Sequence, residues 1–218
     1  MDVVANLEWV RDRIAGAGGD PDRVKVLAVT KGHGLDAVRA ALAAGLVDIG
    51  EDRAHELLAK ADELDDGSVR WHFVGQLQRN KVRQIAHLVH LWQSVDRLRL
   101  GEEISKRSPG ASVLVEMNLT DDPNRGGAAP GLVPGLVDGL RDLALQVEGL
   151  MAVGPMGPDD AVRAAFRTVR ALADELQLPE RSMGMSDDLE LAVEEGSTMV
   201  RVGTALFGPR FPSSTVEN

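Results

Sequence analysis

The stretch that decides the fold is VKVLAVTK, residues 24–31. It is an almost continuous apolar run, which is typical of a parallel strand buried on both faces. Gly32 and Gly34 follow at once, so we expect the chain to turn directly after Lys31. In α/β folds, ligands bind at the carboxyl ends of the strands. Lys31 is therefore a candidate Schiff-base amine at the mouth of the core. The alternative is a surface lysine that merely ends a strand.

The composition bounds the classes of protein that this chain can belong to. Its 218 residues suit one domain, and 44% apolar residues allow a substantial core. It has no cysteine, which excludes disulfides, thiolate catalysis and Cys-ligated metals. The formal net charge of −10 predicts no nucleic-acid partner, because phosphate contacts dominate that affinity. No stretch reads as a membrane span or a signal peptide, so we expect a cytoplasmic protein that binds no membrane.

Strand and helix signals alternate along the chain. A leading helix is expected within residues 1–20, and strands are expected at 24–30, 47–50, 70–75, 88–95, 112–118, 147–153, 181–185 and 198–202. Helices are expected at 35–44, 53–64, 78–87, 96–106, 131–145, 162–176, 187–195 and 204–208, with a longer loop at 119–130. Eight such repeats predict an α/β fold, a single TIM-type (β/α)₈ barrel domain over residues 1–218, with a doubly wound open sheet as the alternative. Residues 211–218 are expected to be a disordered tail.

Polar residues collect where the predicted strands end, and a closed barrel would gather them at one mouth. They are Lys31, Glu51, Asp52, His72, Asn118, Ser186 and Arg201. The segments SMGMSDD (182–188) and GSTMVRVGTALFG (196–208) each lead from a strand toward a helix, with a hydroxyl at Ser186 and an open backbone at Gly203. This pattern predicts a phosphate site, with ordinary capping and turn geometry as the alternative.

A lysine at one strand end and a phosphate site at the last two indicate a ligand with both a carbonyl group and a phosphate. Two chemistries fit this ligand. One is pyridoxal 5′-phosphate (PLP) held covalently by Lys31, and the other is a Schiff-base aldolase that acts on a phosphosugar.

Several blocks carry a resemblance to a known family. They are AVTKG, WHFVGQLQRNK (71–81), GLMAV (149–153), SMGMSDDLELA and STMVRVGTALFG. From about residue 24 to 208 the chain resembles the PLP homeostasis proteins, single-domain barrels similar to the amino-terminal, fold type III domain of alanine racemase. The resemblance implies that Lys31 forms the aldimine with PLP. It also implies that Ser186 and the backbone at Gly203 and Thr204 contact the phosphate, and that Arg201 lies near the pyridine nitrogen.

The chain departs from the family pattern at two positions. Asp52 stands where the family commonly has asparagine, and Arg125 stands where a lysine is often found. An added negative charge at Asp52 would weaken PLP binding or change the protonation of the ring. The arginine puts a secondary lysine contact in doubt.

The same residues bear on whether the chain is an enzyme. A guanidinium stays charged and favours an unprotonated pyridine, which is a poorer electron sink than a pyridinium. Racemisation also needs a second acid/base, which the resembling racemases take from a tyrosine of their second domain, whereas this chain has no tyrosine. We therefore expect no catalytic residues and a role in PLP (vitamin B6) homeostasis. The alternatives are a weak PLP-dependent racemase or lyase, and the phosphosugar aldolase.

The remaining candidates are weaker. Asp52, His72, Met151 and Met185 are further candidate contacts of the cofactor, although His72 could equally order a strand-end network and the methionines could simply pack the barrel. The histidines lack the spacing of a metal site, so we expect no metal. PLP-dependent apoenzymes are the expected partners, and the chain is expected to be a monomer.

Overall fold

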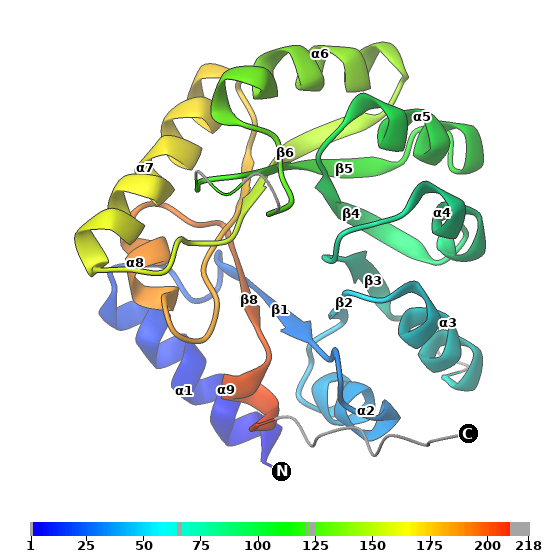
Figure 1. The fold of residues 1–218 in the computed structure, drawn as a ribbon. Helices are drawn as coiled ribbons and strands as arrows, with labels where there is room; N and C mark the ends of the chain where they lie inside the picture. Colours follow the sequence, from blue (N-terminus) through cyan, green and yellow to red (C-terminus); the bar gives the residue numbers. More distant parts are fainter. Residues whose placement is uncertain (1, 65–66, 121, 123–124, 210–218) are drawn as a thin grey trace.

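The computed structural model describes residues 2–64, 67–120, 122 and 125–209. Within them, eight parallel strands close into a barrel in chain order, and β8 pairs with β1 (Figure 1). The strands are β1 Lys25–Val29, β2 Asp48–Glu51, β3 Arg70–Phe73, β4 Val89–Val95, β5 Ser112–Met117, β6 Gln146–Ala152, β7 Glu180–Ser182 and β8 Met199–Val202. The predicted (β/α)₈ barrel is confirmed, and the pairing of β8 with β1 excludes the open sheet.

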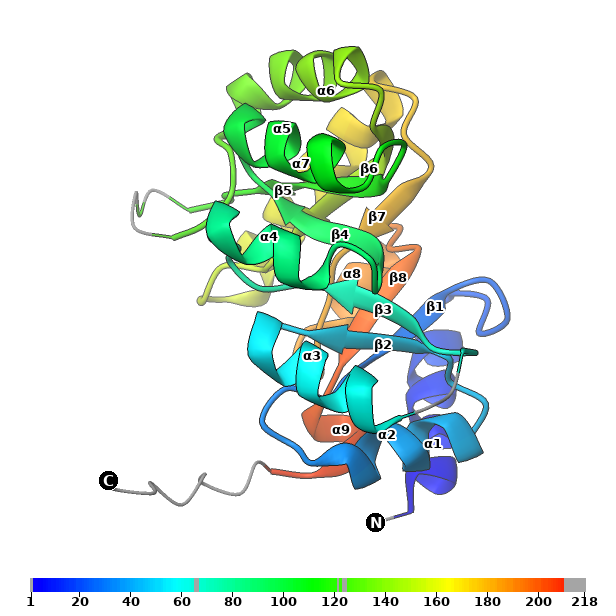
Figure 2. The ribbon, with the colours of Figure 1, turned by 90° about the vertical axis from the view of Figure 1, so that its right-hand side faces the viewer.

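Helices surround the barrel on its outer side (Figure 1). They are α1 Val3–Gly16, α2 Leu35–Ala43, α3 Ala54–Glu63, α4 Arg79–Ile85, α5 Leu98–Arg107, α6 Val133–Asp142, α7 Asp159–Glu175, α8 Leu189–Glu194 and α9 Thr204–Phe207. The leading helix α1 packs beside α8 and the short α9, where the last strand returns to the first (Figure 1). Seen from the side, α3, α4, α5 and α6 follow one another along the outside of the barrel (Figure 2). Pro134 is tolerated because it lies at the start of α6, where no intrahelical N–H bond is lost. No helix of the described residues has the length and apolarity needed to cross a membrane.

The element ends differ from the predicted ones by at most three residues, and the two largest shifts at carboxyl ends have local reasons. The strand expected at 181–185 ends at Ser182, because Gly184 adopts a φ of +91° that strand backbone does not allow. The helix expected to reach residue 145 ends at Asp142, before Ala144 with a φ of +57°. The tail predicted at 211–218 lies outside the described residues.

The barrel has an inner and an outer apolar layer, and strand parity decides which residue enters which layer. Inward side chains pack into a small cluster of Leu27, Val29, Leu91, Leu114, Met151 and Met199. Outward side chains such as Ile49, Val113 and Val200 join the larger core between the strands and the helices. Polar groups carried on the inward positions of the strand ends are therefore directed to the mouth of the barrel.

Candidate functional site

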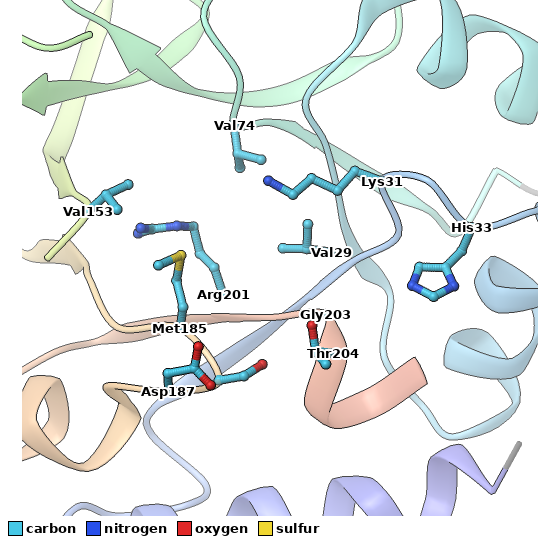
Figure 3. A pocket seen from close by; sticks show the side chains of 11 residues that line it. Val29, Lys31, His33, Val74, Val153, Met185, Asp187, Arg201, Gly203 and Thr204 are labelled. Carbon is cyan, nitrogen blue, oxygen red and sulfur yellow. The ribbon is translucent and has the colours of Figure 1, made fainter. Parts of the chain in front are cut away.

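A cavity of about 240 Å³ lies at the carboxyl ends of β1, β7 and β8 (Figure 3). It is lined by Val29, Lys31, His33, Val74, Val153, Met185, Ser186, Asp187, Arg201, Gly203 and Thr204. Six of the residues expected at a cofactor site thus border one cavity, although up to 173 positions separate them: Lys31, Met185, Ser186, Arg201, Gly203 and Thr204. The others lie elsewhere, as described below.

Lys31 follows β1 and extends its amine into the cavity (Figure 3). Its side chain is one-third exposed, so the amine is accessible from solvent. Its Nζ lies 3.4 Å from Oδ2 of Asp52, which follows β2. Asp52 therefore reaches the site through Lys31, and it is not part of the cavity wall.

A buried ion pair supports the backbone before Lys31. Lys60 of α3 places its Nζ 2.5 Å from Oε1 of Glu51 and donates to the Thr30 carbonyl oxygen at 2.8 Å. The Thr30 hydroxyl donates to the same Glu51 oxygen at 2.5 Å. Burial raises the pKa of Glu51, and Lys60 and Thr30 partly offset that effect. The expectation that Glu51 joins the mouth is wrong, because its position on β2 faces α3.

Ser186 and the start of α9 form one wall of the cavity. The Ser186 hydroxyl oxygen accepts a hydrogen bond from the Ala205 backbone N–H at 3.2 Å, which leaves its own proton to donate. Arg13 of α1 donates to the Ser186 carbonyl oxygen at 2.9 Å and holds this loop in place. Gly203 permits the close approach of β8 to β1, because an added Cβ would lie 3.0 Å from the Val29 oxygen. The hydroxyl donor and the open backbone suit an anion.

Arg201 is the buried cation of the cavity, with 5% of its surface exposed. Its Nη1 donates to the carbonyl oxygen of Ser182 at 2.6 Å and to the Ser182 hydroxyl oxygen at 3.1 Å, and its Nη2 donates to the Ala152 oxygen at 2.8 Å. Burial lowers its pKa to about 10, so the group stays charged at neutral pH. Its Nε has no acceptor among the described residues and can donate into the cavity.

His72 and Met151 do not border the cavity. His72 lies inside the barrel, 2% exposed, with its Nε2 3.0 Å from Asp48 and its Nδ1 2.8 Å from Gln93. The strand-end network considered from the sequence therefore describes it better than a cofactor contact. Met151 packs in the inner apolar cluster beneath the site.

Asn118 also lies outside the cavity, where it orders the loop after β5. Its Nδ2 donates to the carbonyl oxygens of Asp122 and Arg125 at 2.9 and 3.1 Å. Arg125 in turn donates to the Gly154 oxygen at 3.1 Å, so its guanidinium joins this loop to the segment after β6. Across residues 2–209, with the gaps given above, no group of three or more His, Cys, Asp or Glu side chains could hold a metal ion.

Sequence reasoning did not single out several residues that line the cavity. Val29, Val74 and Val153 form its apolar walls, and His33 and Asp187 border it as well. Strand parity was the signal that could have identified the first three. Val29 lies two positions before Lys31, and Val74 and Val153 lie two positions after inward-facing residues of β3 and β6.

A buried carboxyl group on β5 was missed too. Glu116 shares the inward parity of Leu114, and its Oε2 is buried without a hydrogen-bond partner among the described residues. Burial raises the pKa of Glu116 to about 7, with a further contribution from Asp96, while Arg201 and Arg125 oppose the rise. β5 lies four strands from β1 in either direction around the barrel, so Glu116 and Lys31 belong to opposite walls.

Glu116 predicts a specific pH dependence of stability. The folded pKa of about 7 exceeds the ordinary value of 4.5, so the folded state binds more protons than the unfolded state between these values. The free energy of unfolding therefore falls as pH rises through this window, by about 3 kcal/mol from this group. We expect Glu116→Gln to abolish that loss and to be more stable than wild type at pH 8 in urea titrations.

A control and a contrary result complete this test. Glu102→Gln removes an exposed carboxylate of α5 and should keep the wild-type pH profile. If Glu116→Gln and wild type lose stability equally between pH 5 and pH 8, Glu116 is not the titrating group.

The fold and the cavity define the class, a (β/α)₈ barrel of the alanine racemase N-terminal-domain type with a lysine after its first strand and a buried arginine on its last. The sequence model of the alanine racemase N-terminal domain matches residues 2–210. Alanine racemase from Corynebacterium glutamicum shares this fold, with a TM-score of 0.74 at 16% identity over 96% of this chain and 60% of that one.

Within this class, the chain belongs to the pyridoxal phosphate homeostasis protein family. The protein of that name from Pseudomonas aeruginosa is 42% identical over 209 residues, which cover 92% of this chain and 91% of that protein. The one from Aquifex aeolicus is 39% identical over 94% of this chain and 95% of that protein. The structure of PipY from Synechococcus elongatus with PLP bound has a TM-score of 0.81 and 36% sequence identity, and the match covers 91% of this chain and all of that one.

Proposed function

We propose that this chain binds PLP in the cavity of Lys31 and serves PLP (vitamin B6) homeostasis without a dedicated reaction of its own. The observation that carries the proposal is that a lysine amine, a buried arginine and a hydroxyl donor converge on one cavity. When bound, PLP supplies an aldehyde that condenses with an amine and a ring that withdraws electrons. The family relationship supports PLP over the phosphosugar of the alternative hypothesis.

Each part of PLP has a suitable group of this chain. Lys31 supplies an accessible amine for the aldehyde. The Ser186 hydroxyl and the backbone at Gly203 and Thr204 suit the phosphate, because Ser186 already accepts from Ala205 and keeps a proton to donate. The Nε of Arg201 suits the pyridine nitrogen, since a cationic donor pairs with an unprotonated ring nitrogen. The apolar walls described above suit the flat faces of the ring.

The proposal is tested by the visible absorbance of the purified protein with added PLP. We expect a band near roughly 420 nm, the usual region for PLP bound covalently to a lysine. Borohydride treatment followed by peptide mapping should then find the label on Lys31. A colourless protein that acquires no label on Lys31 when PLP is added would overturn the proposal.

Asp52 gives a prediction about affinity. Its carboxylate lies 3.4 Å from the Lys31 amine, beside the place where the phosphorylated, negatively charged ligand would lie. We expect Asp52→Asn to tighten PLP binding about threefold, because exposed charge pairs contribute up to about 1 kcal/mol. Asp36→Asn is the matched control, since it removes the same charge from a fully exposed side chain. The gain should shrink at high salt, and weaker binding by Asp52→Asn would show that Asp52 acts instead by placing Lys31.

A second candidate function, weak PLP-dependent amino-acid chemistry, is favoured by Glu116 alone. Its raised pKa of about 7 is suitable for proton transfer at neutral pH, and it stands on the wall opposite β1. Steady turnover of any amino acid well above that of free PLP, lost in Glu116→Gln, would establish this function. Turnover equal to that of free PLP leaves the homeostasis role in place.

The homeostasis proposal includes the fate of the cofactor. We infer a cytoplasmic monomer that passes PLP to PLP-dependent apoenzymes. The supporting feature is the location of the amine, which is partly exposed at the mouth and so within reach of solvent and of other proteins. Mixing the PLP-loaded chain with an apoenzyme should restore that enzyme's activity faster than an equal concentration of free PLP does. Equal rates would remove direct transfer from the proposal.

A further inference from the structure

A chain of hydrogen bonds runs from the cavity through the barrel interior. Arg201 Nη1 lies 3.1 Å from the Ser182 hydroxyl, and that hydroxyl donates to Gln93 Oε1 at 2.7 Å. Gln93 Nε2 lies 2.8 Å from His72 Nδ1, and His72 Nε2 lies 3.0 Å from Asp48 Oδ1. Ser182, Gln93 and His72 are at most 2% exposed. The five side chains come from β8, β7, β4, β3 and β2, so this chain of hydrogen bonds crosses the barrel.

The hydrogen bonds of this path all run in one direction. Gln93 uses its oxygen for Ser182, so its amide N–H donates to His72 Nδ1 and the remaining ring proton of His72 lies on Nε2, toward Asp48. Burial lowers the pKa of His72, which keeps the ring neutral. Burial acts to raise the pKa of Asp48, but the hydrogen bonds from His72 and Arg70 outweigh it and lower that pKa to about 2. Every donor therefore points from Arg201 toward a carboxylate.

Arg201 depends on this arrangement. No carboxylate contacts its guanidinium in the described part of the chain, and only the neutral oxygens of Ser182 and Ala152 accept from it. Those acceptors fix the Nη edge and leave the Nε edge for the cavity. The Ser182 hydroxyl donates its single proton to Gln93, which turns that proton away from Arg201 and leaves the lone pairs of the oxygen for the Arg201 Nη1 donor.

We propose that Ser182, Gln93 and His72 are positioning residues of the cofactor site, which hold Arg201 with its Nε toward the ring nitrogen of PLP. This inference rests on the proposed function. The residues do not border the cavity and act through Arg201. They set the affinity for the pyridine ring and the electronic state in which the ring is held.

PLP titrations of Ser182→Ala and Gln93→Leu test the proposal. Each variant should bind PLP about tenfold more weakly, the effect of one hydrogen bond to a charged group, and the absorbance band of bound PLP should shift. The double variant should bind PLP no more weakly than either single variant, because the two single variants and the double variant all interrupt the same path. Ser197→Ala is the matched control, since it removes a buried hydroxyl beside β8 whose partners among the described residues are only the backbone oxygens of Arg181, Met183 and Met199.

The protein without PLP provides a second measurement. Nitrogen-15 NMR should show the wild-type His72 ring neutral with its proton on Nε2, and Gln93→Leu should release Nδ1 and mix the tautomers. A proton on Nδ1 of the wild-type ring, or a doubly protonated ring at neutral pH, would contradict the proposed path of hydrogen bonds. This result does not depend on whether the variants fold.

The outcomes separate this inference from the proposed function. If the wild-type protein takes up no PLP, the proposed function is wrong, and the proposed role of the hydrogen-bond path at the cofactor site is wrong with it. Wild type that binds PLP, with Ser182→Ala equal to Ser197→Ala in affinity and spectrum, overturns the inference and leaves the proposed function standing.

Discussion

Lys31→Ala is expected to lose covalent attachment of PLP completely, with no band near roughly 420 nm and no label after borohydride. The variant lacks the amine that projects into the cavity, while Ser186 and Arg201 keep their contacts with Ala205 and Ser182. The apparent affinity for PLP should fall about a hundredfold, near 2.8 kcal/mol. The fold should persist, because the Lys31 side chain is partly exposed and, among the described residues, its only ion pair is with Asp52 at the surface of the site.

Lys25 gives a matched control for this experiment. It starts the same strand, it is half exposed, and it pairs with Glu180 at the opposite end of β1 from the cavity. Lys25→Ala should therefore keep both the band and the label on Lys31. An unchanged band in Lys31→Ala would mean that another amine holds the cofactor and that the site assignment is wrong.

Lys60→Met is expected to lower the free energy of unfolding by about 3–5 kcal/mol, a larger loss than for the more exposed lysines Lys25 and Lys31. The substitution leaves the Glu51 carboxylate at 0% exposure with the Thr30 hydroxyl as its only side-chain donor in the described part of the chain, and it leaves the Thr30 carbonyl without the ammonium. For a chain of this length the midpoint of thermal unfolding should fall by roughly 10 °C. Because Lys31 follows Thr30 directly, PLP binding should weaken as well.

Two variants show whether burial of the ion pair is the cause. Lys25→Met breaks the more exposed pair with Glu180 and should cost less than about 1 kcal/mol. The double variant Glu51→Gln, Lys60→Met removes both charges and should recover most of the lost stability. If Lys60→Met costs no more than Lys25→Met in urea and thermal unfolding, the buried pair does not anchor the end of β1.

The barrel could be predicted from the sequence because the signals for its strands, helices and turns lie in residues that are neighbours in the chain. A parallel strand covered on both faces requires a short apolar run, and the turn that follows requires glycine or polar residues, so each strand and helix left its own signal. The same rule placed Lys31, Ser186 and Arg201 at strand ends, and strand ends meet at one mouth in any barrel. The grouping of these three around one cavity was therefore predictable.

The errors have a shared physical cause. A strand end fixes the height of a residue in the barrel, but the parity of the strand fixes whether it faces inward or outward. On β2, Asp48 and Gly50 face inward, so Glu51 faces α3 and binds Lys60. His72 does face inward, but it lies a full layer below Val74 and misses the cavity.

The sequence by itself determined the barrel, the lysine after the first strand and the polar wall formed by the last two strands, because each depends on residues that are neighbours in the chain. Only the tertiary structure decided how the interior polar groups pair. Gln93 and Ser182 are 89 positions apart, and their hydrogen bond exists only because closing the barrel places β4 and β7 across one interior. The path from Arg201 to Asp48, and the burial of Glu116 Oε2 without a hydrogen-bond partner among the described residues, follow from that closure and have no local signal.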